Sequence, residues 1–466
     1  MDLRGKDILV VGLARTGIAA ARFLQRREAQ VRATDRAEEG RLGPDVNRLR
    51  DMGIPLELGG HRMESFTAAD LIVVSPGVPH TIPPLAAARA SGVPVIGEME
   101  LAGRFIGEPI VAVTGTNGKT TVTELVGAML AASGRRVFVG GNIGTPLIAH
   151  VDSGARVEVV VAEVSSFQLD TSDTFHPAVG VLLNVTDDHL DRYAGFEAYA
   201  ASKMRLFAHQ RPGDTAVLNA ADAVVRARSG DIRSRKLFYN RPETADAHAT
   251  VADRTLTLRV PGRAEVALSL SGFKLRGPHN AENAAAAALA ALAAGAGPQG
   301  IQTVLDTFAP APHRLETIAV IDGVEYVNDS KATNVDAVRR GLECFGGRVV
   351  LIMGGVDKGG DFGRLRDAVQ ARGRALVLLG GARDLIRAAL DGLAPTREAA
   401  SMRQAVQAAR EMAAAGDVVL LAPGCASFDR YANYQERGDD FRREVVRLKE
   451  SNEKRVGTDR RKCLWP

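Results

Sequence analysis

The sequence predicts an α/β protein built from three domains. Short runs of aliphatic and β-branched residues, such as those at 7–11, 110–113 and 157–161, alternate with helical patterns along most of the 466-residue chain. Many of these runs end in glycine and polar residues, which is typical of parallel strands whose carboxyl ends carry a ligand site. A chain of this length is too long for one hydrophobic core, and ordinary domain sizes indicate about three domains.

Composition excludes several classes of protein. Charged residues make up 24% of the chain and hydrophobic residues 45%, which is ordinary for a globular protein. The formal net charge of +4 is small for this length and argues against nucleic-acid binding. Three widely separated cysteines without metal-ligand spacing indicate a reducing compartment. Neither a signal-peptide pattern nor an apolar run long enough to span a bilayer is present, so we expect a cytoplasmic protein that does not bind membranes.

Residues 1–97 are expected to form a Rossmann-like domain. A strand runs into GLARTG at 12–17, and a helix follows. This segment has the outer glycines of a dinucleotide fingerprint, but Ala14 stands where a second glycine normally lets backbone approach a pyrophosphate. Other strands of this region end at Asp35 and at the turn 75–77. A purely structural domain remains an alternative, because a fold alone does not determine a function.

The most informative motif is TGTNGKTT at 114–121, which lies between an apolar strand and a helical pattern. A glycine turn at the start of a helix leaves backbone N–H groups free to bind phosphate. Lys119 would reach the terminal phosphates of a nucleotide, and the Thr120 hydroxyl would contact Mg²⁺. Gly115 and Gly118 enclose two residues instead of the usual four, so the segment is a shortened nucleotide-binding loop. The motif predicts an ATP site.

We expect a central P-loop-type ATPase domain over residues 98–310, with a parallel sheet. Asn142 lies in a glycine turn after one strand, and Glu163 ends another, where a carboxylate is often a magnesium ligand. His189 belongs to a polar cluster after a further strand, and a metal or substrate role and a surface role are evenly balanced. Lys203 in its helical stretch reads, by itself, as part of a solvated face.

The remaining segments complete the three-domain interpretation. Short alternating pieces at 225–275 predict a small antiparallel part. Asn280 and Asn283 lie at the start of an Ala-rich helix, where each alone reads as an N-cap but the pair also suits a purine edge. Residues 311–450 predict a second Rossmann-like domain, because three of its strands end in glycine and polar residues. The charged, unpatterned segment 451–466 is expected to be disordered.

Several strings of residues together resemble the Mur ligase family. They are TGTNGKTT, GGNIGTP, EVSSFQL, NVTDDHLDRY, GPHNAENAAAA, PHRLE and NDSKATN. NDSKATN and APGCASFD favour the members that add D-glutamate over the family's other ligases. The resemblance implies an ATP-dependent ligase that joins D-glutamate to UDP-N-acetylmuramoyl-L-alanine through an acyl phosphate, releasing ADP and phosphate, in peptidoglycan precursor synthesis. We expect a monomer.

The resemblance also implies roles for individual residues. The catalytic residues would be Lys119, Glu163, His189 and Lys203. Two Mg²⁺ sites would be held by Thr120, Glu163, His189 and Lys203, the last as a carbamate, which reverses the interpretation of Lys203 as a solvated residue. ATP would be bound by Gly115, Thr116, Asn117, Gly118, Lys119, Thr120, Thr121, Asn280, Asn283, Arg314, Asp329 and Lys331. The UDP substrate would be bound by Thr16, Asp35, Arg36, Ser75, Pro76, Gly77, Asn142, Ser165 and Gln168. D-Glutamate would be bound by Thr333, Lys358, Ser427, Phe428 and Tyr434.

Two other classes of function compete with the ligase. A nicotinamide-dependent oxidoreductase would use the first domain, but Ala14 and the ATP loop argue against it. A non-catalytic ATP-dependent binding protein would keep the loop without needing Glu163, His189 and Lys203.

Overall fold

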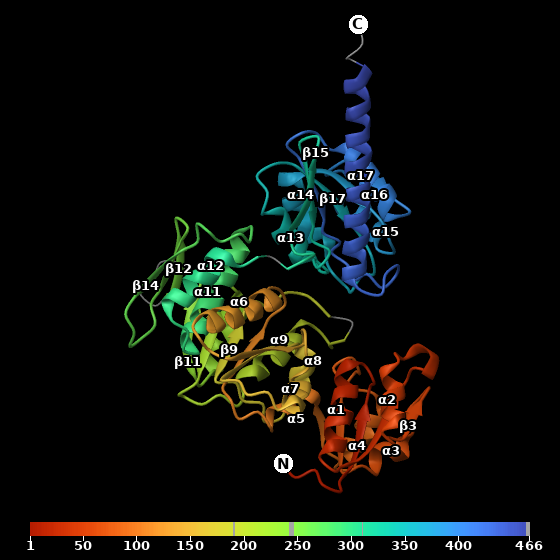
Figure 1. The fold of residues 1–466 in the computed structure, drawn as a ribbon, viewed down its shortest axis with the longest axis vertical. Coiled ribbons are helices and arrows are strands. Elements are labelled where there is room, and N and C mark those ends of the chain that lie inside the picture. Colours follow the sequence, from red (N-terminus) through yellow and green to blue (C-terminus); the bar gives the residue numbers. More distant parts are fainter. Residues whose placement is uncertain (190–191, 242–246, 310, 463–466) are drawn as a thin grey trace. The chain divides into compact units, whose positions relative to one another are not determined.

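The structure is a computed structural model that describes residues 1–189, 192–241, 247–309 and 311–462. The described residues, whose helices and strands are labelled in Figure 1, divide into two compact units by their internal contacts. The first unit contains the described residues of the ranges 1–185, 195–272 and 282–306, and the second contains those of the ranges 186–194, 273–281 and 307–462. Each unit is built from helices around sheets that are mostly parallel, which confirms the α/β class.

The first sheet of the first unit has five parallel strands in the order β3-β2-β1-β4-β5. The strands are β1 (Asp7–Val11), β2 (Gln30–Asp35), β3 (Leu56–Leu58), β4 (Leu71–Val74) and β5 (Val95–Gly97). Their helices are α1 (Arg15–Arg26), η1 (Glu39–Arg41), α2 (Asp45–Asp51), α3 (Met63–Thr67) and α4 (Pro83–Ala90). Hydrophobic side chains of β1 and β4 are almost fully buried and form a core with Phe66 and Leu85. Because β1 lies between β2 and β4, the loops after these three strands are neighbours.

The second sheet of the first unit has nine strands in the order β14-β13-β12-β11-β10-β9-β6-β8-β7. The strands are β6 (Ile110–Thr114), β7 (Val137–Gly141), β8 (Val159–Glu163), β9 (Val179–Leu182), β10 (Thr215–Asn219), β11 (Arg235–Tyr239), β12 (Ala249–Ala252), β13 (Thr255–Leu258) and β14 (Val266–Ser269). The helices are α5 (Glu98–Gly103), α6 (Lys119–Ala132), α7 (Leu147–Ser153), α8 (Ser166–Asp170), α9 (Phe196–Met204), η2 (Arg205–Phe207), α10 (Ala223–Arg228), η3 (Ser229–Asp231), α11 (Pro278–Ala293) and α12 (Pro298–Thr307).

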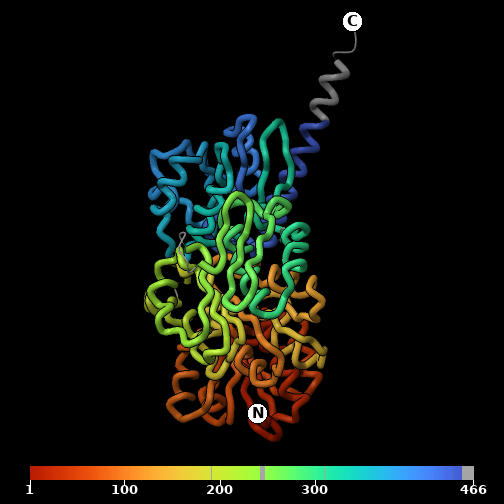
Figure 2. Tube along the Cα trace, turned by 90° about the vertical axis from the view of Figure 1, so that its left-hand side faces the viewer, coloured from red at the N-terminus to blue at the C-terminus, as the bar shows by residue number. Residues whose placement is uncertain are grey.

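The order of this second sheet determines which loops meet at the carboxyl ends of its central strands. Strands β6 and β8 are buried along their whole length, as expected for the centre of a parallel sheet. β6 pairs with β8 on one side and with β9 on the other, so the segments that follow these strands meet. The antiparallel part predicted at 225–275 is confirmed for β12, β13 and β14, which lie in the green part of the trace in Figure 2.

The second unit has one six-stranded sheet in the order β15-β16-β20-β17-β18-β19. The strands are β15 (Glu316–Ile321), β16 (Val324–Asn328), β17 (Val349–Met353), β18 (Gly373–Leu378), β19 (Thr396–Glu398) and β20 (Val418–Leu421). The helices are α13 (Val335–Leu342), η4 (Phe362–Leu365), α14 (Arg366–Arg372), α15 (Arg383–Leu390), α16 (Met402–Met412) and α17 (Tyr434–Lys462). Only the pairing of β15 with β16 is antiparallel in this sheet. Hydrophobic side chains fill both of its faces, as in a doubly wound domain.

Helix α17 continues through residues 451–462, where the sequence predicted disorder from Ser451 onward. Adding residues to a helix that is already formed costs little, because nucleation has been completed earlier in the chain. No proline interrupts the segment. The last four residues of the predicted tail, 463–466, lie outside the described residues.

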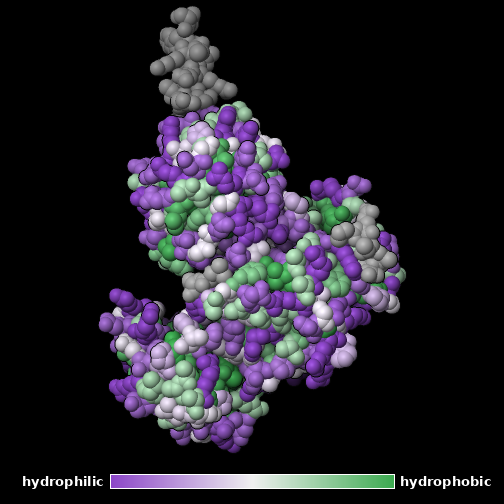
Figure 3. Space-filling model, turned by 180° about the vertical axis from the view of Figure 1, so that it is seen from behind, coloured by the Kyte–Doolittle hydropathy of each residue, from purple (hydrophilic) through white to green (hydrophobic). Residues whose placement is uncertain are grey.

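The surface of the molecule matches the composition of the chain. The face shown in Figure 3 is mostly hydrophilic, and hydrophobic side chains gather only in small areas. Among the described residues, no helix combines the length and the hydrophobicity that a bilayer crossing requires. The three sheets fall within the ranges 1–97, 98–310 and 311–450, while the exact boundaries of these domains stay predictions.

Candidate functional site

The loop at 115–118 joins β6 to α6, so the predicted strand, turn and helix are confirmed. Gly118 has φ of +87° and directly precedes the helix. A Cβ atom placed on Gly118 would lie 2.5 Å from Asn283 Oδ1. Both observations require glycine at this position, because other residues rarely adopt such a φ and the space is already filled. The loop therefore brings backbone close to Asn283, one of the two asparagines expected to read a purine.

Glu163 is the centre of a hydrogen-bonded group at the carboxyl end of β8. Its carboxylate is buried, and its Oε2 accepts a hydrogen bond of 2.6 Å from Thr120 Oγ1. Its Oε1 accepts one of 2.8 Å from Asn142 Nδ2. These three residues were predicted separately from three motifs, and the strand order places them together. A hydroxyl and a carboxylate at this spacing are the hard oxygen ligands that Mg²⁺ prefers, so the residues fit the ion.

Two lysines face the same loop. Lys119 Nζ donates hydrogen bonds to the carbonyl oxygens of Gly115 (2.9 Å) and Thr116 (2.8 Å). Lys203, on α9, is only 1% exposed; its Nζ donates to Gly115 O (2.9 Å) and lies 4.5 Å from the ring centroid of Tyr199. The solvated-face interpretation of Lys203 is therefore wrong. Burying an amine costs free energy. The chain accepts this cost at a position where the amine of Lys203 contacts the nucleotide loop.

Asn184 holds the nucleotide loop in place, and it is not among the predicted site residues. Its Oδ1 accepts from Asn117 N (2.8 Å), and its Nδ2 donates to Asn117 O (3.0 Å). The backbone carbonyl of Asn184 also accepts from Thr116 N (2.9 Å). The sequence feature that could have identified Asn184 is its position as a polar residue shortly after the buried strand β9, which pairs directly with β6. Elsewhere in the loop region, the Thr116 hydroxyl lies 3.2 Å from Tyr199 OH, and Thr121 is buried in α6.

The residues of the first sheet that are expected to bind the UDP substrate lie at the carboxyl ends of its strands. Asp35 ends β2, and Ser75 follows β4. Asp35 Oδ2 accepts from the backbone N–H of Leu13 (2.7 Å), and Ser75 Oγ donates to Gly12 O (2.7 Å). Both side chains therefore shape the loop between β1 and α1, and Thr16 is the second residue of the helix after that loop. Arg36 and Gly77 are exposed near the same edge, and Pro76 is partly exposed.

Ser165 and Gln168 form a capping box at the start of α8. The Gln168 backbone N–H donates to Ser165 Oγ (3.3 Å), and the Ser165 backbone N–H donates to Gln168 Oε1 (2.9 Å). This arrangement satisfies two backbone donors at the beginning of a helix. The side chains of both residues are thus occupied within the protein, so their substrate role stays a prediction.

In the second unit, several residues expected to bind nucleotide surround the ends of β16 and α11. Asn280 Nδ2 donates to Arg276 O (2.7 Å), within the turn that begins α11. Asp329 follows β16, and its Oδ1 accepts from Leu315 N (3.3 Å). Loss of contact with water raises the pKa of the Asp329 carboxyl to about 7, although the Leu315 N–H and the nearby charge of Arg314 act in the opposite direction. This carboxyl therefore holds its proton to a higher pH than a solvated aspartate does.

Four of the residues expected to bind D-glutamate occupy three neighbouring loops of the second unit, and the fifth, Tyr434, begins α17. Strands β16, β20 and β17 are adjacent, and the loops after them carry Thr333, Ser427 and Lys358, respectively. Lys358 Nζ lies 2.7 Å from Asp188 Oδ1. Phe428 is 75% exposed, which is unusual for a large aromatic side chain. These loops therefore offer a cation, hydroxyls and an exposed ring.

Two further predicted residues belong to the second unit. Lys331 Nζ lies 4.0 Å from the ring centroid of Tyr434, a favourable cation–π distance. His189 has φ of +57°, and its Nε2 lies 3.7 Å from Asp188 Oδ2. A non-glycine residue at such a φ is uncommon and is enriched at functional sites.

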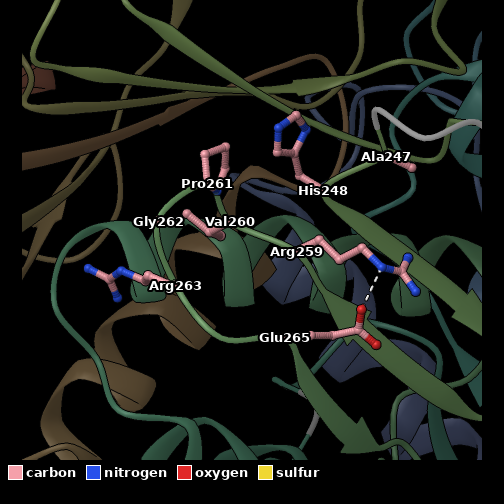
Figure 4. A pocket seen from close by; sticks show the side chains of 8 residues that line it. All are labelled: Ala247, His248, Arg259, Val260, Pro261, Gly262, Arg263 and Glu265. Carbon is pink, nitrogen blue, oxygen red and sulfur yellow. Dashed lines mark hydrogen bonds and ion pairs between the residues drawn. The ribbon is translucent and has the colours of Figure 1, made fainter.

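Two negative observations limit the site. Within the described part of the chain, no three His, Cys, Asp or Glu side chains are grouped so that they could hold a metal ion. The hollow in Figure 4, of about 390 Å³, contains none of the predicted site residues. It is lined by Ala247, His248, Arg259, Val260, Pro261, Gly262, Arg263 and Glu265. Arg259 and Glu265 pair with each other there at 2.8 Å, and the lining residues are distant in sequence from the nucleotide loop.

Comparison with known proteins matches all three regions of the chain. The family models are the Mur ligase MurD-like N-terminal domain (residues 6–97), the Mur ligase middle domain (residues 113–291) and the Mur ligase glutamate ligase domain (residues 313–425). Two relatives are named UDP-N-acetylmuramoylalanine–D-glutamate ligase. That of Desulfosudis oleivorans is 52% identical over 98% of this chain and 99% of its own length. That of Desulfatibacillum aliphaticivorans is 53% identical over 96% and 100%.

Solved structures share the fold. A pseudomurein peptide ligase type C from Methanothermus fervidus covers 96% of this chain and 100% of its own, with a TM-score of 0.61 and 20% identity. The MurF ligase from Thermotoga maritima in complex with ADP covers 96% of both chains, with a TM-score of 0.58 and 16% identity. Together with the relatives of about half-identical sequence, these matches show that the chain belongs to the Mur ligase family.

Proposed function

We propose that this Mur ligase joins D-glutamate to UDP-N-acetylmuramoyl-L-alanine and consumes ATP. The observation that carries the proposal is 52% identity, over 98% of the chain, to a relative named UDP-N-acetylmuramoylalanine–D-glutamate ligase. The organisation of the nucleotide loop around Glu163, Lys119 and Lys203 supports an ATP-dependent reaction. ADP and phosphate are the other products.

The reaction proceeds in two steps. The alanine carboxylate attacks the γ-phosphorus of ATP, the bond from that phosphorus to the β-phosphate oxygen breaks, and ADP leaves. The amine of D-glutamate then attacks the acyl phosphate at its carbonyl carbon; it loses a proton as the amide forms, and phosphate leaves. Both reactants of the first step are anions, so the enzyme must neutralise charge and align them. Lys119, released from its carbonyl partners, and the N–H groups of the loop supply this function.

Two Mg²⁺ sites are part of the proposal. Thr120 and Glu163 would hold one ion, and His189 and Lys203 the other. Carbon dioxide added to the neutral Lys203 amine forms a carbamate and releases a proton, which turns a buried cation into an oxygen ligand. Bound Mg²⁺ neutralises phosphate charge. The burial of Lys203 supports this role, since an unmodified buried amine is costly.

The substrates are assigned to the predicted residues. The UDP moiety would bind at Thr16, Asp35, Arg36 and the turn 75–77, while Asn142, Ser165 and Gln168 would lie along the rest of that substrate. ATP would contact the loop 115–121 together with Asn280, Asn283, Arg314, Asp329 and Lys331. D-Glutamate would contact Thr333, Lys358, Ser427, Phe428 and Tyr434. A monomeric, cytoplasmic enzyme with domains at 1–97, 98–310 and 311–450 completes the proposal.

An amino-acid panel tests the reaction. The purified protein is incubated with ATP, Mg²⁺ and UDP-N-acetylmuramoyl-L-alanine, and phosphate release is measured with D-glutamate, L-glutamate, L-alanine, a diamino acid or D-Ala-D-Ala. Mass spectrometry checks that the product gains one glutamyl residue. We expect release only with D-glutamate and only when the UDP substrate is present. ATP hydrolysis that does not depend on either substrate would exclude the ligase reaction. Phosphate release with another amino acid would contradict the proposed specificity for D-glutamate.

A further inference from the structure

Helix α17 contributes a buried guanidinium that the predicted site residues do not include. Arg437 is only 2% exposed. Its Nε donates to Ser330 Oγ (3.0 Å), and its Nη2 donates to Ser330 O (2.9 Å). Its Nη1 donates to Cys425 O (3.0 Å). One side chain therefore bonds to two separate loops of the second unit.

These two loops are the ones that carry predicted substrate residues. Ser330 lies in the loop after β16, between Asp329 and Lys331, and Cys425 lies in the loop after β20, two residues before Ser427. The guanidinium donates to two backbone carbonyl oxygens and to one serine hydroxyl, which is attached to the backbone by a short side chain. These hydrogen bonds therefore fix the positions of the loop backbones directly. Arg437 thus determines how far apart the two loops stand.

A third loop, which carries Lys358, closes around the same guanidinium. A Cβ atom on Gly355 would lie 3.2 Å from Arg437 Nη1 and 2.1 Å from Ala426 O. Val356 and Ala426 exchange two backbone hydrogen bonds of 2.9 Å each. The loop at 354–358 is therefore held against the loop at 425–428, and both meet at Arg437.

The charge of Arg437 is poorly compensated. Among the described residues, no carboxylate lies within the 4.0 Å of an ion pair with it, and Asp429 exerts only a longer-range attraction. Burial lowers the pKa of Arg437 to about 10, so the group is still cationic at neutral pH. A buried cation without an ion-pair partner is expensive. A nearby bound anion would offset that cost, and the loops around Arg437 are those assigned to a dicarboxylate.

We propose that Arg437 is a positioning residue of the amino-acid subsite. It holds the loops at 329–333, 354–358 and 425–428 in one arrangement and adds positive charge beneath them, which favours a substrate with two carboxylates. The inference rests on the proposed function, because D-glutamate is the amino acid that the subsite would bind.

The experiment compares Arg437→Met, which removes the charge and the donors, with Arg437→Lys, which keeps the charge but not the fork of donors. Arg443→Met is the matched control, since Arg443 lies on the same helix, is 58% exposed and pairs with Asp440. Initial rates of phosphate release are measured while D-glutamate, ATP and the UDP substrate are varied one at a time. Thermal unfolding of each variant is recorded alongside.

We expect the KM for D-glutamate to rise about tenfold or more in Arg437→Met, because hydrogen bonds from a charged group are the strong ones. Arg437→Lys should fall between this variant and the wild type, and the KM for the UDP substrate should change less than about threefold. Equal rises in every KM, an unchanged KM for D-glutamate, or a failure of both variants to fold would overturn the positioning role. Wild-type protein without D-glutamate-dependent phosphate release would instead overturn the proposed function.

Discussion

Asn184 is the residue through which the neighbouring strand β9 controls the nucleotide loop. Replacing it by alanine removes the two hydrogen bonds to Asn117, of 2.8 Å and 3.0 Å. Each bond contributes about 1 kcal/mol net, so the loop loses roughly 2 kcal/mol of ordering. If that ordering must be restored when ATP binds, affinity falls roughly 30-fold, since 1.4 kcal/mol corresponds to a factor of ten.

The assay is calorimetric titration of ATP into Asn184→Ala, together with its thermal unfolding. Asn219→Ala is the control, because Asn219 is also a buried asparagine at a strand end of the same sheet. Its side chain donates to Leu183 O (2.9 Å) and accepts from Ala221 N (3.0 Å), and neither bond involves the nucleotide loop. Both variants should lose similar stability, and only Asn184→Ala should lose ATP affinity. Equal ATP affinity in the two variants would refute the reasoning.

Three further predictions concern the first unit. Gly118→Ala should weaken ATP binding as measured by calorimetry, because the new Cβ would clash with Asn283 and a left-handed conformation costs a non-glycine residue about 1–2 kcal/mol. Gly134→Ala is the control, because Gly134 has a similar φ of +83° but open space around it, and ATP binding should be unchanged. Burial raises the pKa of Glu98 to about 7, so the stabilising contribution of its protonated form is present at acidic pH and is lost as pH rises from about 4.5 through 7. Chemical denaturation of the wild type should show the free energy of unfolding falling by up to roughly 3 kcal/mol over this window. The free energy of unfolding of Glu98→Gln should depend less on pH. Lys203→Ala should lose ligase activity that formate, acetate or high chloride partly restores, and normal turnover without rescue would exclude the carbamate.

Much of the nucleotide site could be predicted from local sequence. Strand β6, the glycine turn and helix α6 follow from a β-branched run, two glycines and a helical pattern that are contiguous in the chain. Glu163 and Asn142 were each marked by their position at a strand end. That they share hydrogen bonds with one another follows from the strand order, which sequence patterning does not specify.

Other residues could not be interpreted from their neighbours. Lys203 lies in a helix whose local pattern resembles a solvated face, yet packing against the nucleotide loop buries it. Ser165 and Gln168 were selected because they lie in a motif of the family. The structure shows that they also form a capping box, which a serine followed three residues later by a glutamine could have indicated from the sequence. Arg437 sits among charged residues of an exposed-looking helix, and nothing in that pattern distinguishes it from its neighbours.

The sequence by itself determined the α/β class, the ATP loop and the family, because each depends on residues that are contiguous or that occur in a recognisable order. Tertiary structure alone decided which polar residues meet: Asn184 with the loop, Lys203 beneath it, and Arg437 between Ser330 and Cys425. These contacts join residues about 12 to 107 positions apart in the chain, and their geometry is set by strand order and core packing. No local pattern of hydrophobicity or propensity encodes that geometry, since it arises only when separate segments are brought to the same edge of a sheet.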